Sequence, residues 1–210
     1  MKLYKTVMKE ARADYVTEKS KFIAYVRPVS SKEEADCFVA EIKKKHRDAT
    51  HNVPAMVIGD KMQIQWASDD GEPQGTSGPP IVKLLTSEGI TNIAIVVTRY
   101  FGGIKLGTGG LVRAYTAAAK AGLEAAGLCY VESKLRLLCE FDYTYLDKLR
   151  NLSGEKFNIG DIRYTDKIEA DILCEPECEE DIKAIISNIT SGKTVIKCRD
   201  TFNVKTLCRE

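Results

Sequence analysis

Apolar and polar positions follow two successive patterns along the chain, and the first pattern predicts alternating strands and helices. Short apolar runs of strand length occupy residues 22–29, 52–58, 62–66 and 93–97. Helical spacing of apolar residues occupies 35–42, 80–85 and 111–126, and the stretch Ser31-Lys32-Glu33-Glu34 before the first of these is a capping box. This order predicts a mixed domain in which helices pack on a sheet.

The second pattern begins at Leu135, where apolar residues alternate with polar ones up to Phe141. Helical spacing follows over 145–152 and again over 182–189, where acidic residues come first and Gly192 follows. Strand patterns occupy 158–164, 167–174, 193–199 and 202–207. The resulting order βαββαβ is that of a ferredoxin-like domain. We therefore expect an α+β protein with two domains, 1–132 and 133–210.

Composition supports two small domains and restricts the classes of partner. The chain has 210 residues, 44% of them hydrophobic, and a net charge of +1, so any contact with nucleic acid must come from a local patch. Seven cysteines show no framework spacing and are interpreted as reduced thiols, and no signal peptide or apolar span is visible. We expect a cytoplasmic protein with no membrane partner; the sequence indicates no oligomeric state.

The densest chemical signal is a glycine-rich stretch between the predicted strand 93–97 and the alanine-rich helix 111–126. Five of the 15 glycines lie between positions 102 and 110, three cations bracket them, and no acid interrupts the stretch from Arg99 to Arg113. A glycine segment before a helix can present backbone N–H groups to an anion. The predicted anion-binding or nucleic-acid-binding residues are Arg99, Gly102, Gly103, Lys105, Gly107, Gly109, Gly110 and Arg113.

An architectural interpretation of the same glycines stays open, because glycine also permits tight crossovers and close packing. The spacing is neither that of a P-loop nor G-x-G-x-x-G.

A turn-rich acidic loop at 68–80 carries the second candidate site. Asp69, Asp70 and Glu72 could hold Mg²⁺, which prefers carboxylate oxygens and water, or the aspartates could instead accept backbone N–H groups within a turn. His51 begins a predicted strand and could line the same cleft. The candidate catalytic residues are therefore Asp69, Asp70, Glu72 and His51, and a cleft with acids on one lip and cations on the other would suit a metal–phosphate site.

Four sequence blocks resemble the IMPACT/YigZ family. They are Glu-Lys-Ser-Lys-Phe-Ile at 18–23, Lys-His at 45–46 with Ala-Thr-His-Asn at 49–52, the segment 68–76, and the segment 96–115 that contains Arg-Tyr-Phe-Gly-Gly. The resemblance covers roughly residues 15–127. It implies an N-terminal domain with the fold of the second domain of a small-subunit ribosomal protein, and a C-terminal domain similar to the last domain of elongation factor G.

The resemblance also suggests a role. Eukaryotic relatives act in translational control through the general amino-acid-control kinase pathway, using an additional N-terminal domain, so their partners are not transferred to this chain. Val53 stands where relatives often carry cysteine, which argues against a cysteine nucleophile there.

The resemblance favours a translation-linked regulatory protein that binds RNA, the ribosome or another phosphate-bearing ligand. The alternative is a Mg²⁺-dependent enzyme acting on a phosphorylated small molecule or nucleotide, so catalysis is left undecided. A third hypothesis, that the acidic segment 175–181 docks a basic partner, has less support, because acids at a helix start already complement the helix dipole.

Overall fold

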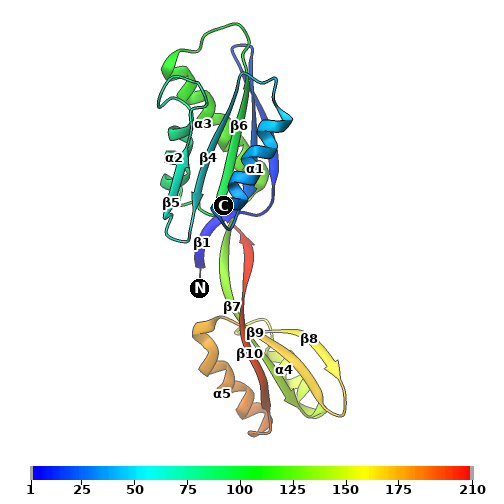
Figure 1. Cartoon of the computed structure of the whole chain (residues 1–210). Coiled ribbons are helices and arrows are strands. Elements are labelled where there is room, and N and C mark those ends of the chain that lie inside the picture. The colour runs from blue at the N-terminus through cyan, green and yellow to red at the C-terminus, as the bar shows by residue number, and fades with distance from the viewer. Residues whose placement is uncertain (1, 209–210) are drawn as a thin grey trace. The chain divides into compact units, whose positions relative to one another are not determined.

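The computed structural model describes residues 2–208, which fall into two compact units (Figure 1). The first unit comprises Tyr4–Val131 together with the described residues from Lys205 onward, and the second comprises Glu132–Val204 together with residues 2–3. The α+β class expected from the sequence is confirmed, because each unit combines a β-sheet with helices.

A five-stranded sheet forms the centre of the first unit, in the order β2-β3-β6-β4-β5 with every neighbouring pair antiparallel. Its strands are β2 (Ala11–Thr17), β3 (Ser20–Pro28), β4 (His51–Ile58), β5 (Ile64–Ala67) and β6 (Ile93–Tyr100). The sequence predicted the last four. It missed β2, as well as β1 (Lys2–Val7), because β2 lies at the sheet edge and alternates charged and small residues.

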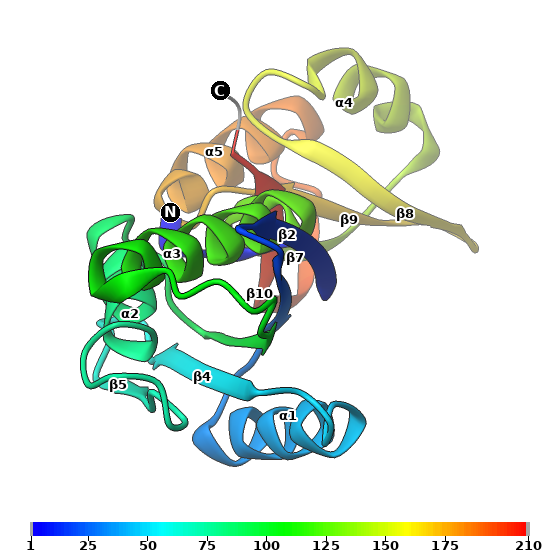
Figure 2. The ribbon, with the colours of Figure 1, turned by 90° about the horizontal axis from the view of Figure 1, so that it is seen from above.

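Helices cover both faces of this sheet, as Figure 2 shows. Helix α1 (Lys32–Lys45) packs Ala35, Phe38 and Ile42 against one face. Helices α2 (Gly78–Ser87) and α3 (Gly107–Ala126) pack against the other. Because both faces are covered, β3, β4 and β6 are nearly continuous runs of buried residues.

Two local features set the positions of these helices. The side chain of Ser31 accepts a hydrogen bond from the backbone N–H of Glu34, as the capping box predicts. Helix α3 lies close to the sheet because Gly122 has no side chain: a Cβ there would come within 2.7 Å of Val26 Cγ2 and 3.0 Å of Ala24 Cβ.

The second unit has the predicted βαββαβ order. Its elements are β7 (Leu128–Phe141), a short 3₁₀ turn (Tyr143–Tyr145), α4 (Leu146–Leu152), β8 (Asn158–Tyr164), β9 (Ile168–Cys174), a second 3₁₀ turn (Pro176–Cys178), α5 (Glu179–Thr190) and β10 (Val195–Leu207). Strand β7 pairs with β10 and β9, and β9 pairs with β8, which is ferredoxin-like connectivity. Where the sequence predicted two strand segments after α5, the structure has the single strand β10.

The buried core of this unit consists mainly of alternate residues of β7 and β9 together with the inward faces of α4 and α5. Across residues 2–208, no helix is both long and apolar enough to cross a bilayer. All seven cysteines are free thiols.

Candidate functional site

Two neighbouring strands place His51 and Arg99 side by side. These residues are direct partners in the antiparallel pairing of β4 with β6, and Phe22 of β3 lies opposite Arg99 on the other side. The Arg99 guanidinium lies 5.4 Å from the Phe22 ring centroid and 5.5 Å from that of Phe101. The Arg99 side chain is only 6% exposed, so its charge needs a buried partner.

That partner is Glu72, which comes from the acidic loop. Oε1 of Glu72 accepts hydrogen bonds from Arg99 Nη1 and from the Tyr115 hydroxyl, both at 2.7 Å, and the Glu72 side chain is 3% exposed. Burial, followed by the bond to Glu72, raises the pKa of Tyr115 far above its ordinary value, so this hydroxyl stays a donor. One carboxylate thereby joins the loop, strand β6 and helix α3.

His51 is oriented by the same loop. Its Nδ1 lies 2.8 Å from the carbonyl oxygen of Asp70, and a carbonyl can only accept, so Nδ1 carries the proton and donates. The other ring nitrogen, Nε2, lies 3.8 Å from Oε1 of Glu72. The imidazole is therefore fixed with Nε2 directed toward the carboxylate.

Asp69 has a structural role at the start of α2. Its Oδ1 accepts from the backbone N–H groups of Ser77 and Gly78 and from the Ser77 hydroxyl, and its Oδ2 accepts from the backbone N–H of Gly75. Burial opposes ionisation of this carboxyl, but the hydrogen bonds from Ser77, Gly75 and Gly78 outweigh it and hold the pKa of Asp69 below its ordinary value of 3.8. The turn interpretation of the sequence fits this residue.

Substituting Asp69 with asparagine is expected to destabilise the first unit by about 1 kcal/mol at neutral pH, because the charged acceptor of the loop and helix start is lost. A carboxyl whose pKa is lower in the folded state contributes stability above its unfolded pKa, and that stability disappears as the pH falls through the folded pKa. Part of the wild-type loss of stability below pH 3.8 should therefore be absent in Asp69→Asn. Urea unfolding followed at Trp66, the single tryptophan, measures this across acidic pH.

Glu124→Gln, at an exposed position of α3, is the control for this prediction. It should retain the wild-type acid profile. An Asp69→Asn profile parallel to that of the wild type would show that Asp69 is not linked to folding.

Asp70 points away from Glu72. Its Oδ1 lies 2.6 Å from Lys43 Nζ of α1 and its Oδ2 accepts from the backbone N–H of Asn52 at 2.7 Å. The three acids considered as a Mg²⁺ site thus have three separate sets of partners, and among residues 2–208 no three histidine, cysteine, aspartate or glutamate side chains are grouped so that they could hold a metal ion. Of the three acids only Glu72 lines the cavity, so in this structure they do not converge on one point, and Mg²⁺ binding by them stays a prediction.

The glycine-rich stretch divides into a loop and a helix start. Helix α3 begins at Gly107, so Gly107, Gly109 and Gly110 form its first turn, and only Gly102 and Gly103 remain in the loop. Gly102 lies against the backbone of Lys19, where a Cβ would approach the carbonyl carbon to 2.0 Å, and Gly103 has a φ of +88°. Gly102 is therefore explained by close packing and Gly103 by its backbone conformation, in line with the architectural interpretation of these glycines.

The start of α3 has no capping group. Leu106 occupies the N-cap without a side-chain hydrogen bond, and the first turn contains no acid. The first N–H groups of a helix lack partners within the helix and carry partial positive charge. Gly107 and Thr108 at this end line a cavity of about 330 Å³.

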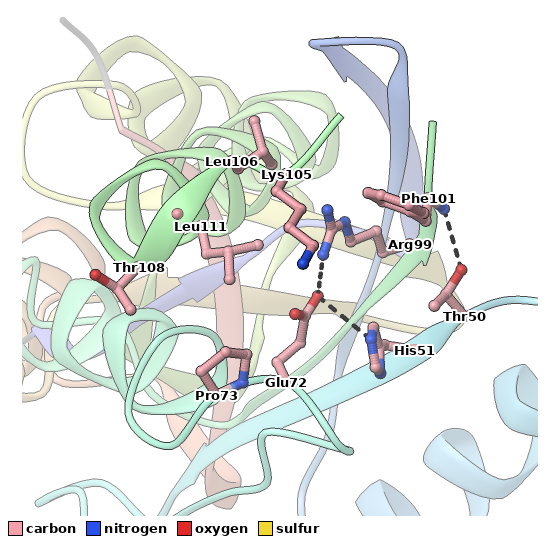
Figure 3. Close-up of a pocket in the computed structure, with 11 residues that line it drawn as sticks. Thr50, His51, Glu72, Pro73, Arg99, Phe101, Lys105, Leu106, Thr108 and Leu111 are labelled. Carbon is pink, nitrogen blue, oxygen red and sulfur yellow. Dashed lines mark hydrogen bonds and ion pairs between the residues drawn. The ribbon is translucent and has the colours of Figure 1, made fainter. Parts of the chain in front are cut away.

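The acidic loop and the glycine-rich segment border this one cavity, the juxtaposition that a shared cleft requires (Figure 3). The lining residues are Thr50, His51, Glu72, Pro73, Arg99, Phe101, Lys105, Leu106, Gly107, Thr108 and Leu111. Sequence reasoning missed the apolar wall, whose residues follow ordinary loop and helix patterns, and it missed Tyr115, whose contact with Glu72 joins residues 43 positions apart.

The three predicted cations occupy different environments. Arg99 forms an ion pair with Glu72, and its Nε is buried without a hydrogen-bond partner. Lys105 extends into the cavity and forms no ion pair with any residue from 2 to 208 (Figure 3). Arg113 lines a neighbouring cavity of about 380 Å³, which shares Lys105 and Leu106 with the first. The three cations therefore do not converge on one point: Arg99 and Lys105 line the first cavity, and Lys105 and Arg113 line the second.

Comparison with known proteins identifies both parts of the chain. Residues 18–123 match the Impact N-terminal domain, and residues 139–193 match a domain of unknown function, DUF1949. The chain is 41% identical over 197 residues to IMPACT family member YvyE of Bacillus subtilis, covering 92% of this chain and 90% of that protein. Over 94 residues, 42% of this chain and 29% of the relative, it is 36% identical to Protein IMPACT of Mus musculus.

The crystal structure of a hypothetical protein has a similar fold. It is 28% identical to this chain, with a TM-score of 0.58, and the match covers 93% of this chain and 97% of the other.

Proposed function

The chain belongs to the IMPACT family, and from that premise and the geometry of the cavity we propose that it is a translation-linked regulatory protein that binds RNA. Phosphate groups of the RNA bind at the N-terminus of α3 and at Lys105, and the same strand passes Arg113 in the neighbouring cavity. Such a role places the protein in the cytoplasm. It assigns no catalytic step to the chain.

The uncapped start of α3 is the observation that carries this proposal. A helix of 20 residues begins at a cavity with neither a capping side chain nor an acid in its first turn. Free N–H groups and the helix dipole together favour a bound anion. Lys105, unpaired in the part of the chain that the structure describes, supplies a full positive charge beside them.

The neighbouring cavity extends this positive region beyond a single anion. Its lining includes Arg113, which has no ion-pair partner among residues 2–208, as well as Lys105. Two cationic positions in adjoining cavities suit the repeated phosphates of a nucleic-acid strand better than one isolated phosphate. The low net charge of +1 means that affinity must come from these few contacts.

Binding of a short oligouridylate to the full chain, measured by fluorescence anisotropy over a range of salt concentrations, tests the proposal. Affinity should fall as salt rises, and Lys105→Ala and Arg113→Ala should each weaken binding and reduce the salt slope by about one. Lys61→Ala, in the turn between β4 and β5, is the matched control and should leave both quantities unchanged. Binding without a salt slope, or equal slopes in all variants, would rule the proposal out.

A further inference from the structure

The cavity at the start of α3 is lined by acceptor groups as well as by cations, and this distinguishes it from a simple anion site. The ion pair with Arg99 and the hydrogen bond from Tyr115 both use Oε1 of Glu72. Oε2 of the same carboxylate accepts no hydrogen bond from residues 2–208, and this oxygen is not fully buried. A free carboxylate oxygen therefore faces the space that Lys105 also enters (Figure 3).

His51 supplies a second acceptor beside the first. Nδ1 donates to the carbonyl oxygen of Asp70, so in the Nδ1–H tautomer Nε2 carries a lone pair, and it lies 3.8 Å from Glu72 Oε1. Two adjacent acceptors repel a phosphate but match a ligand that offers two adjacent O–H donors. The vicinal 2′- and 3′-hydroxyls of a ribose are such a pair, and carboxylates commonly recognise ribose hydroxyls in nucleotide sites.

The start of α3 in the same cavity suits an anion. The first-turn residues Gly107 and Thr108 line it, together with Lys105. Arg99 also lines the cavity, and its buried Nε is the only fully buried side-chain polar atom without a hydrogen-bond partner in residues 2–208. A buried donor of this kind costs free energy unless a partner arrives, so it is an independent indication of a ligand.

Apolar side chains line the rest of the cavity. Pro73, Phe101, Leu106 and Leu111 contribute to the wall, and Phe101 is 46% exposed. The volume of about 330 Å³ lies at the lower limit for small-molecule sites. One nucleotide offers a phosphate for the cations, an apolar base for the wall and hydroxyl donors for the acceptors, whereas inorganic phosphate would leave both acceptors unused.

We propose that this cavity binds one ribonucleoside 5′-phosphate unit, with its phosphate at the N-terminus of α3 and Lys105 and its 2′,3′-hydroxyls at Glu72 and His51. The unit is either a free nucleotide or the last nucleotide of an RNA, since only a 3′ end leaves both hydroxyls available. In the second case the inference rests on the proposed RNA binding and states how the RNA is held: by its 3′ end, with the preceding strand passing Arg113.

Calorimetric titration of the full chain with adenosine 5′-monophosphate, its 2′-deoxy analogue and inorganic phosphate tests the ribose contact. The ribonucleotide should bind up to about tenfold more tightly than the deoxynucleotide, because the hydrogen bond from its 2′-hydroxyl to His51 Nε2 is lost, and phosphate should bind more weakly still. Equal affinity for the two nucleotides, or for phosphate and the ribonucleotide, would overturn the inference.

Two variants assign the ends of the ligand. Lys105→Ala should weaken both nucleotides equally, because it removes a phosphate contact. His51→Ala should reduce the ratio between the two affinities while deoxynucleotide binding persists, and Lys61→Ala should match the wild type. Lys105 is exposed, so that variant is informative even if His51→Ala fails to fold.

Oligouridylates ending in a 3′-hydroxyl or a 3′-phosphate distinguish the two sources of the ligand. Weaker binding of the 3′-phosphorylated strand supports capture of the RNA end. If RNA binds with a salt slope but the two nucleotides are not distinguished, this inference fails and the proposed function stands. If the nucleotides are distinguished and RNA shows no salt-dependent binding, the site takes free ribonucleotides and the proposed function fails.

Discussion

Replacing Glu72 with alanine is expected to destabilise the first unit by about 3–5 kcal/mol, since it leaves the charge of Arg99 buried and unpaired. The Arg99 side chain is 6% exposed, so water cannot take over the lost contact, and the Tyr115 hydroxyl loses its acceptor as well. Urea denaturation followed by the fluorescence of Trp66, which lies in β5 of the same unit, measures the loss.

Matched substitutions show whether burial is the cause. Arg12→Met removes a cation that pairs with Asp14 while 50% exposed, and it should cost less than about 1 kcal/mol. Tyr115→Phe removes a single hydrogen bond to the Glu72 carboxylate and should cost about 2 kcal/mol. In Glu72→Ala combined with Arg99→Met, part of the loss should be recovered, because no unpaired charge remains. Additive losses would contradict the view that the two residues form one buried pair.

Gly102→Ala is expected to destabilise the unit by about 3 kcal/mol or more, because the new methyl group would overlap the main chain. Its Cβ would lie 2.0 Å from the carbonyl carbon and oxygen of Lys19 and 2.5 Å from the nitrogen of Ser20. Neither segment can withdraw easily, since Lys21 pairs with Tyr100 immediately beside the contact. Urea denaturation with Trp66 as the probe again gives the free energy of unfolding.

The matched control comes from the same glycine-rich stretch. Gly109 lies in the first turn of α3, and a Cβ there would meet only Arg113 Nη1, at the ordinary contact distance of 3.6 Å. Gly109→Ala should therefore be neutral or stabilising by up to about 1 kcal/mol, because alanine favours the helix. Similar losses in both variants would mean that the contact with Lys19 does not set the requirement for glycine at 102.

Much of the fold could be predicted because its signals are local. The capping box at Ser31 marks the start of α1, and strand-length apolar runs mark β3, β4 and β6. Strands β1 and β2 were missed because both are partly exposed. Lysines interrupt β1, and charged residues occupy alternate positions at the start of β2, so neither pattern differs from that of a surface loop.

The candidate site was predicted only in outline. Acidic and glycine-rich segments do border one cavity, but side-chain direction within the acidic loop depends on its conformation, including the φ of +47° at Asp70. The sequence cannot show that Asp69 turns back to α2 while Glu72 crosses to Tyr115. It also treats Arg99 as a free cation, whereas strand pairing with His51 carries it into the interior.

The carboxylate of Glu72 holds the acidic loop, strand β6 and helix α3 together, and all three contribute to the cavity wall. The cavity is therefore absent from the unfolded chain. A ligand of this cavity acts as a folding cofactor for residues 4–131, adding RT ln(1 + [L]/Kd) to their stability, about 2.7 kcal/mol at a hundred times Kd. In the cell, the abundance of such a ligand and the lifetime of the folded unit would rise and fall together.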